Sequence, residues 1–374
     1  MRRFLLLDIF QWFAVIIGLT SYRVVDDRFV QTRLSRMYTL IVNVITVTML
    51  PAATLDLFNS FSMGFWLPQF MWITPYVLHA VNYAVIVHTL IFRGHRNIIQ
   101  MELHHLSVKL NREMGRAGKQ MNSTLRRLFY LKTLTLSCMC LWHFLQSFIV
   151  IGVSSLSKIL GLIIINSGFM ILMSIVHCYF VSLWKVAIGY DFVNQQLEEL
   201  IATRSPLTSR YAEELRSLWS LHASLSLTAH KINRIYGRQM LASRFEYITF
   251  TAVDSYMEII YYFSESAPAI SKCFGISFFS IRTIDFFMAD YICDLVAQYQ
   301  SMPKHTASEG VMSNELSSFV IYQNSMNLNL KICGLFPANR KQWLNMMACI
   351  LGNSAVLMQY HLMMSGKEEK YFKS

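Results

Sequence analysis

The chain has 374 residues, of which 54% are apolar and 14% aromatic, whereas only 15% are charged. Soluble domains carry about 25% charged residues, so this composition excludes an ordinary water-soluble fold and indicates a polytopic membrane protein. The net charge of +11 could indicate nucleic acid, but the basic residues lie mostly in the connections between apolar runs. That placement is typical of membrane topology, and we expect no nucleic-acid partner.

The seven cysteines show neither a zinc-site spacing nor a secreted-disulfide spacing. Three of them, Cys138, Cys140 and Cys178, lie inside apolar runs and are interpreted as small core residues. The sequence also contains no nucleophile motif and no phosphate-binding loop. We therefore expect no metal, no cofactor and no enzymatic activity.

Residues 1–36 are predicted to form an amphipathic segment on the cytosolic surface of the membrane. The apolar stretch Phe4–Leu19 resembles a signal peptide, but Asp8 interrupts it and no small-x-small cleavage site follows. If this stretch crossed the membrane, the four arginines between positions 23 and 36 would lie outside. A surface segment is therefore preferred.

Seven apolar runs follow, and their length predicts an all-α protein with seven transmembrane helices. The runs are Met37–Phe58, Phe65–Phe92, Leu128–Val153, Ile159–Ile188, Met240–Phe263, Phe274–Tyr299 and Trp343–Met364. The fifth and sixth runs are weaker because both contain charged residues, and a buried cytosolic hairpin would give a similar pattern. Residues 37–299 would thus hold the first six helices.

The distribution of lysine and arginine predicts the orientation. With a cytosolic N-terminus, the inner segments hold 24 of these residues and the outer segments hold 5. The positive-inside rule therefore predicts a cytosolic N-terminus and an extracellular C-terminus, with residues 365–374 as an outer tail. This orientation is opposite to that of G-protein-coupled receptors, whose Asp-Arg-Tyr and Asn-Pro-x-x-Tyr motifs are also missing from runs three and seven.

The inner connections, residues 93–127, 189–239 and 300–342, are long, whereas the outer connections are short. Helical spacing of apolar residues predicts amphipathic helices in the second of these, with a break at Ser205-Pro206. Ser313 is a candidate N-cap for a helix in the third. Such helices need a surface to pack on, which an assembly of subunits would supply.

The seventh run, Trp343–Met364, contains no Asp, Glu, Lys or Arg but carries a polar stripe. Ala355 and Val356 share a helix face with Gln359, so a pore lined by this face would have small side chains around Gln359. A ring of Gln359 and Tyr360 could form a narrow constriction. Alternatively, Gln359 only forms a hydrogen bond with a neighbouring helix.

Two stretches resemble the insect gustatory receptors, a family related to insect odorant receptors. One is Gly334-Leu335-Phe336; the other lies where the family signature has Thr-Tyr, five apolar residues and Gln-Phe. Here that frame reads Gly352-Asn353, Ser354 to Met358, and Gln359-Tyr360, so its second half nearly matches and its first half does not.

The resemblance implies a ligand-gated, cation-conducting homotetramer or heterotetramer in the plasma membrane of gustatory neurons. A small-molecule tastant would bind between the outer helix halves, residues 343–364 would form the pore helix, and membrane lipid would surround the assembly. Residues 300–342 and the inner helix extensions would form the anchor that joins the subunits.

Two alternatives remain open. Charged residues in runs five and six could form the substrate or proton site of a secondary transporter, although the internal repeats common in transporters are not found. The divergence at Gly352-Asn353 could instead mark a non-conducting co-receptor subunit that needs partner receptors.

Aromatic and polar residues on the outer halves of runs two to six are candidates for the ligand pocket. They are Trp66, Trp72, Tyr76, His79, Trp142, His143, Gln146, Asn166, Phe169, Glu258, Tyr261 and Tyr262. Packing or an interfacial aromatic belt is the alternative for each of them. Counting the helix rise from the outer ends of runs five and six puts Asp254 level with Arg282, so we expect an ion pair between these two residues. Glu258, one turn above Asp254, and Asp285, at i+3 from Arg282 in the same helix, are the other possible partners of Arg282.

Overall fold

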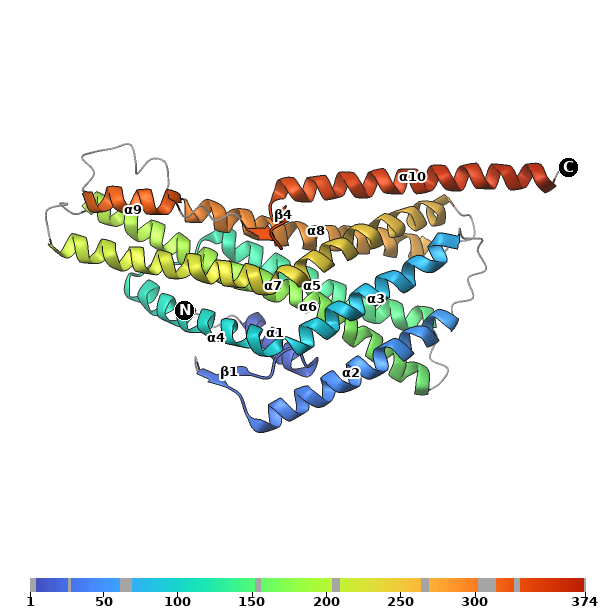
Figure 1. Ribbon diagram of the computed structural model, residues 1–374, viewed down its shortest axis with the longest axis horizontal. Coiled ribbons are helices and arrows are strands. Elements are labelled where there is room, and N and C mark those ends of the chain that lie inside the picture. The colour runs from blue at the N-terminus through green and yellow to red at the C-terminus, as the bar shows by residue number, and fades with distance from the viewer. Residues whose placement is uncertain are drawn as a thin grey trace.

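The computed structural model of the chain describes residues 5–25, 28–60, 69–151, 156–203, 209–263, 269–301, 314–325 and 330–372. Its helices are α1 (Leu5–Ile16), α2 (Arg33–Ser60), α3 (Gln69–Ile91), α4 (Arg93–Arg116), α5 (Ser123–Ile151), α6 (Leu156–Thr203), α7 (Ser209–Phe263), α8 (Ala269–Gln300), α9 (Asn314–Ser325) and α10 (Arg340–Phe372). They form an elongated bundle with α4 and α9 at one end and the carboxyl-terminal part of α10 at the other (Figure 1).

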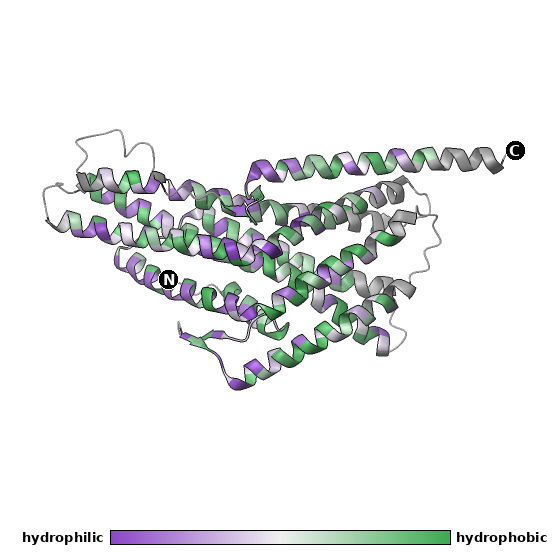
Figure 2. Ribbon diagram, viewed as in Figure 1, coloured by the Kyte–Doolittle hydropathy of each residue, from purple (hydrophilic) through white to green (hydrophobic). Residues whose placement is uncertain are grey.

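Over its described residues each apolar run corresponds to one helix, and these helices are α2, α3, α5, α6, α7, α8 and α10. Residues 65–68 of the second run and 152–153 of the third lie outside the described residues, and Phe92 lies between α3 and α4. Helices α6 and α7 are much longer than their runs, with 48 and 55 residues. At 1.5 Å per residue they extend about 72 and 82 Å, whereas the hydrocarbon core of a bilayer is about 30 Å thick. Their extensions reach toward the end that carries α4 and α9, where hydrophilic residues are frequent (Figure 2).

In the described part of the chain, three helical segments are long and apolar enough to cross a membrane: Arg33–Asp56, Ser123–Leu145 and Leu156–Ala202. The pair Tyr76–Ile91 and Arg93–Arg116, bent by 62°, gives a fourth if it counts as one span. The fifth, sixth and seventh predicted transmembrane runs lie in α7, α8 and α10, and that these helices cross the membrane stays a prediction.

The all-α prediction omitted two short antiparallel hairpins. The first joins β1 (Arg23–Val25) to β2 (Arg28–Val30) within the N-terminal segment, and the second joins β3 (Lys331–Ile332) to β4 (Phe336–Pro337) just before α10. Strands of two or three residues carry too little alternation of apolar and polar residues to be recognised in a sequence. They leave the fold helical.

Helix α6 forms the centre of the bundle and packs against α2, α5, α7 and α8. Phe180, Leu183, Ala187 and Val193 along this helix are all fully buried. Gly189 permits a close approach of α7, because a Cβ there would lie 2.6 Å from Leu225 Cδ2. The length of buried apolar surface along α6 explains why its polar extension stays helical beyond the membrane-length segment.

Helix α9 docks on the extended ends of α6 and α7. Phe319 of α9 is fully buried in an apolar cluster with Leu197 and Leu200 of α6 and Tyr211 and Leu215 of α7. The sequence placed amphipathic helices in these segments, and the structure shows what they pack on within one chain. Ser205-Pro206 and Ser313 lie outside the described residues.

His222 of α7 lies beside this cluster. Its Nε2 is 3.3 Å from the carbonyl oxygen of Gln300 and its ring centroid is 5.7 Å from that of Phe319. Burial lowers the pKa of His222 from the ordinary value of 6.5. The unfolded chain therefore binds a proton at His222 more readily than the folded chain does. The free energy of unfolding is at its full value above about pH 6.5 and falls as the pH decreases below it.

We therefore expect acidification from pH 7.5 to pH 5.5 to loosen α9, and His222→Gln to remove most of this pH dependence. Hydrogen exchange of the backbone amides of α9 in the purified full chain measures it directly. The matched control is His230→Gln, at an exposed position two turns further along α7. Equal pH dependence of the wild-type chain and His222→Gln would contradict this assignment.

Candidate functional site

Helix α10 has one face packed against the bundle. Met346, Ile350 and Ser354 recur every four residues and are buried, and the first two pack in a cluster with Tyr247 of α7 and Phe286 of α8. The Ser354 hydroxyl also donates to a backbone carbonyl of α7 at 3.1 Å. These contacts hold α10 along the edge of the bundle (Figure 1).

The opposite face of α10 carries the residues that the sequence proposed as pore-lining. Ala355, Val356, Gln359 and Tyr360 are all exposed, with 62% of Val356 and 39% of Tyr360 accessible. Gly352 lies one turn earlier, where an added Cβ would meet nothing within 4 Å. These residues form an uncharged, exposed strip along α10.

The β3–β4 hairpin leads into α10 and contains the Gly-Leu-Phe segment. Its turn uses left-handed backbone conformations at Cys333, with φ 51°, and at Gly334, with φ 74°. Asn233 of α7 donates to the carbonyl of Lys331 at 2.9 Å. The hairpin therefore fixes the start of α10 relative to α7.

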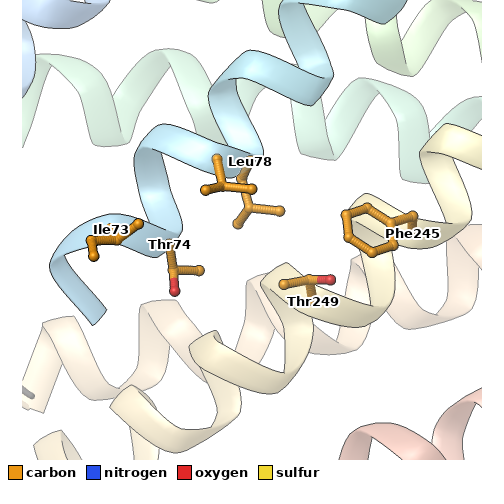
Figure 3. Close-up of a pocket in the computed structure, with 6 residues that line it drawn as sticks. Ile73, Thr74, Leu78, Phe245 and Thr249 are labelled. Atoms are coloured by element: carbon orange, nitrogen blue, oxygen red, sulfur yellow. The ribbon is translucent and has the colours of Figure 1, made fainter. Parts of the chain in front are cut away.

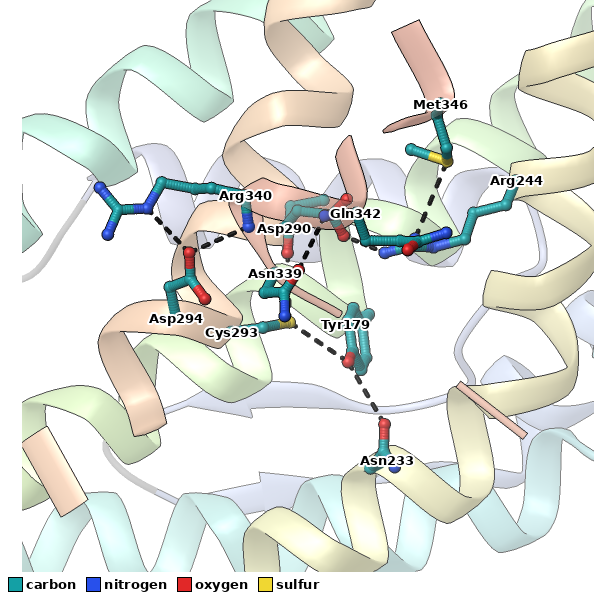
Figure 4. Close-up of polar contacts among 11 residues, drawn as sticks. Tyr179, Asn233, Arg244, Asp290, Cys293, Asp294, Asn339, Arg340, Gln342 and Met346 are labelled. Carbon is teal, nitrogen blue, oxygen red and sulfur yellow. Dashed lines mark hydrogen bonds and ion pairs between the residues drawn. The ribbon is translucent and has the colours of Figure 1, made fainter. Parts of the chain in front are cut away.

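A polar cap fixes the first turn of α10 to α8 (Figure 4). The Asn339 side-chain oxygen accepts a hydrogen bond from the backbone N–H of Gln342 at 2.8 Å, which is an N-cap contact. Arg340 donates its backbone N–H and its Nε to Asp294 Oδ2 at 2.9 and 2.8 Å. The sequence analysis missed this cap, although Asn followed three residues later by Gln is a start signal for a helix.

A buried ion pair lies directly beneath this cap. Arg244 of α7 pairs with Asp290 of α8, and its Nη1 is 3.8 Å from the Met346 sulfur of α10. The Tyr179 hydroxyl of α6 lies 3.5 Å from the Cys293 sulfur nearby. Three helices of the bundle and α10 therefore meet at one buried polar cluster (Figure 4).

The charged residues of the fifth and sixth runs pair differently from the expected arrangement. Arg282 contacts Glu246 at 2.5 Å, while the side chain of Asp254 lies outside the described residues. The antiparallel register brings the Tyr247 hydroxyl within 3.1 Å of Thr283, so Arg282 is level with Glu246. Asp254 is eight residues further along α7, about 12 Å away from that level. The estimate from the sequence was wrong because it assumed that the outer ends of runs five and six lie at the same depth.

Asp285 pairs with Lys132 of α5 rather than with Arg282. Lys132 Nζ lies 2.6 Å from Asp285 Oδ2 and donates to the Asp285 backbone carbonyl at 2.8 Å. Thr135 donates to the other carboxylate oxygen at 2.7 Å. The sequence analysis did not single out Lys132, although a lone lysine inside an apolar run is a signal for a buried acidic partner.

Four aromatic side chains from α5, α6 and α8 contact one another. The His143 ring of α5 stacks on Phe169 of α6 with centroids 4.7 Å apart and meets Phe278 of α8 edge-on at 5.1 Å. Trp142 stacks on Phe278 at 6.0 Å. The structure therefore brings together three of the predicted ligand-binding residues and adds Phe278, which sequence reasoning missed.

The remaining ligand candidates are spread more widely. Asn166 is buried on α6 and donates its amide to the Leu162 carbonyl of the same helix at 2.9 Å. Tyr76 is 44% exposed and His79 is half-buried, and both lie on α3. The side chains of other candidates lie outside the described residues: Trp66, Trp72, Gln146, Glu258, Tyr261 and Tyr262.

A groove of about 270 Å³ separates α3 from α7 (Figure 3). Ile73, Thr74 and Leu78 line it from α3, and Phe245 and Thr249 line it from α7. Its lining is almost entirely apolar. Sequence reasoning missed these residues, because threonine and aliphatic side chains on an apolar helix have the same pattern as packing residues.

A family model described as 7tm Chemosensory receptor matches residues 7–364. The chain is also 44% identical over 301 residues to the Drosophila erecta protein named "Putative gustatory receptor 59b", across 80% of this chain and 51% of that protein. The chain therefore spans about half the length of the curated relative that it matches. The family match extends from α1 to α10 and includes the hairpin, the buried ion pairs and the exposed strip. The chain belongs to the 7tm chemosensory receptor family.

Proposed function

We propose that the chain is a gustatory receptor subunit that acts as a ligand-gated, non-selective cation channel, with α10 lining the pore of a homotetramer or heterotetramer. The exposed uncharged strip on α10 is the observation that carries this proposal. Apolar residues on a free helix face would suit lipid, but a strip with Gly352 and Gln359 leaves polar groups and small side chains uncovered. Copies of the strip around a central axis would cover it and enclose a water-filled path.

The two faces of α10 support a division of roles. The buried face with Met346 and Ile350 keeps α10 in contact with α7 and α8, so movement in the bundle is passed to the helix. The exposed face would place Gln359 toward the permeating ions, where amide dipoles can replace part of an ion's hydration shell. Uncharged lining residues are consistent with weak ion selectivity.

For the tastant, the aromatic cluster of Trp142, His143, Phe169 and Phe278 is the proposed recognition region. Aromatic faces with one imidazole suit a small molecule that is largely apolar and has a polar group. Because the cluster joins α5, α6 and α8, a bound ligand would change how these helices pack. The buried polar cluster at the start of α10 would transmit that change.

Gln359→Ala tests the pore assignment. We expect altered conductance or ion selectivity in voltage-clamped cells, while surface expression and ligand potency are largely kept, because Gln359 makes no contact that holds the described bundle together. Gln298→Ala, which removes an exposed glutamine from α8, is the matched control and should leave permeation unchanged. Unchanged permeation with collapsed surface expression would favour a packing role, and ligand uptake without current would favour a transporter.

The orientation is a separate expectation. With 24 lysines and arginines in the inner segments and 5 in the outer segments, a tag at Met1 should stain only after permeabilisation. A tag at Ser374 should stain intact cells. The reverse staining pattern would contradict both the topology and the proposed location of the pore helix in the plasma membrane.

A further inference from the structure

A cavity of about 680 Å³ is lined by residues of the β1–β2 region, the first turns of α2, the end of α3 and the start of α4. Figure 1 shows where these elements lie in the bundle. Its polar lining includes Ser21, Gln31, Arg36, Arg93 and Asn97. These residues come from four separate segments of the chain, so the cavity exists only in the folded protein. None of the site residues discussed above lines it.

The described lining of the cavity is positively charged and contains no carboxylate. Arg36 donates to the Gln31 side-chain oxygen at 2.7 Å, and Arg93 Nη1 lies 2.8 Å from the Asn43 carboxamide oxygen when that amide is turned to satisfy its neighbours. Both partners are neutral. The contacts of the two guanidinium groups within the described residues are therefore with amides, Gln31 for Arg36 and Asn43 for Arg93.

A third arginine adds to this charge. Arg96, one turn after Arg93, is 2% exposed and donates to the backbone carbonyls of Thr89 and Leu19 at 3.1 and 2.8 Å. Helix α4 begins at Arg93, which lines the cavity, and has no side-chain cap, so the positive end of the helix dipole lies at the cavity. Partly buried cations with only neutral partners leave a desolvation cost that a bound anion would offset.

The polar lining also offers a free hydrogen-bonding group. The Asn97 side-chain oxygen is buried without a hydrogen-bond partner among the described residues, and its amide nitrogen reaches Ser21 Oγ only at 3.4 Å. Buried polar groups in folded proteins nearly always have a partner. A ligand with hydroxyl or ester groups next to its anion would supply one.

One side of the cavity is apolar and open. Leu40, Ile91 and Ile98 line it and are 59%, 70% and 54% exposed. Leu40 belongs to α2, Ile91 is the last residue of α3 and Ile98 belongs to α4. Hydrophobic residues are frequent in α2 and α3 and hydrophilic residues in α4 (Figure 2), so we expect the boundary between hydrocarbon and water where these helices meet. A free inorganic anion would leave this apolar rim uncovered, whereas an acyl chain would cover it.

We propose that this cavity binds an anionic glycerophospholipid. Its phosphate lies between Arg36 and Arg93, its glycerol and headgroup oxygens contact Ser21 and Asn97, and its acyl chains follow the apolar rim formed by α2 and α3. In the proposed orientation this lipid belongs to the cytosolic leaflet, which carries the anionic lipids that basic pockets between membrane helices recognise. The bound lipid would join the N-terminal hairpin to the α3–α4 bend.

Native mass spectrometry of the purified full chain tests this site, with phosphatidic acid and phosphatidylcholine of identical acyl chains offered in equal amounts. We expect preferential retention of phosphatidic acid. Arg36→Gln and Arg93→Gln should each reduce that retention about fivefold, and the double variant about 25-fold, from about 1 kcal/mol per arginine near the surface. The matched control is Arg112→Gln, an exposed position on α4 about 28 Å from Arg93, and it should change nothing.

A second variant keeps the charges and fills the space. A Cβ at Gly94, which lines the cavity, would meet nothing within 4 Å, so Gly94→Leu should fold normally and still lower phosphatidic acid retention. Equal retention of the two lipids, or an equal loss in Arg112→Gln, would overturn the proposal in favour of unspecific charge attraction. Displacement of the lipid by millimolar inorganic phosphate would show that the site takes a free anion instead.

Discussion

We expect Lys132→Met to lose most of its folded, surface-expressed protein. Lys132 is 1% and Asp285 8% exposed, so the substitution leaves a carboxylate buried between α5 and α8 without its cation. Removing one partner of such a pair costs about 3–5 kcal/mol, against a total stability of about 5–15 kcal/mol for a typical domain. Surface biotinylation and thermal unfolding in detergent both measure the loss.

Removing both charges should restore much of that stability. In Lys132→Met with Asp285→Asn no buried charge remains at this site, and the asparagine can still accept the hydrogen bond from Thr135. The matched control is Lys231→Met, which breaks a 2.7 Å ion pair to Glu102 whose side chains are 40% and 44% exposed. Such a pair contributes about 0–1 kcal/mol. A double variant no more stable than Lys132→Met would contradict this account of the pair.

The positions of the helices were predictable from the sequence, because membrane-length apolar runs are a local signal. The expected runs Leu128–Val153 and Trp343–Met364 agree with α5 and α10 to within about one to two turns at most ends. The full extents of α6 and α7 were not predictable from hydropathy, since they depend on packing between their polar extensions and α9. Helical spacing did predict amphipathic helices within residues 189–239, and the resemblance implied that they extend the membrane helices; in the structure α6 continues unbroken to Thr203.

The pairing of charges was beyond the sequence, because it depends on the register and rotation of helices against each other. Depth estimated from run ends placed Arg282 opposite Asp254, whereas the α7–α8 register places it opposite Glu246. If one helix is shifted by two turns along its neighbour, each charged residue on it lies opposite a different residue. The uncharged face of α10 was predictable, since 3.6-residue periodicity alone groups Ala355, Val356 and Gln359.

The cavity at the α3–α4 bend illustrates the same limit. The sequence indicates that residues 1–36 form a basic segment on the membrane surface. This inference rests on the composition of the whole segment and does not identify which arginines lie together. Which arginines share a cavity depends on a 62° bend near Phe92 and on a hairpin of three-residue strands. Neither feature has a signature as clear as an apolar run.

We also expect Arg244→Met to lose folded protein, and its rescue to separate stability from signalling. Arg244 and Asp290 are 4% and 2% exposed, and both Arg244 Nε and Asp290 Oδ2 are buried without a hydrogen-bond partner among the described residues. This pair is therefore only partly satisfied, so removing Arg244 alone costs about 3–5 kcal/mol, whereas removing both charges should be close to neutral. Arg244→Met with Asp290→Asn should reach the cell surface.

In that double variant the contact between Arg244 and the Met346 sulfur of α10 is lost, so ligand binding in the bundle should be coupled more weakly to the pore helix. We expect a lower maximal current per surface receptor, with permeation properties unchanged because the exposed face of α10 is untouched. Lys231→Met is the matched control, since its ion pair joins α7 to Glu102 of α4 rather than to α10, is 40% and 44% exposed and contributes about 0–1 kcal/mol. If the double variant reached the surface and passed wild-type currents, the buried pair would be purely structural, and α10 would receive the ligand signal through its apolar contacts with Tyr247 and Phe286 alone.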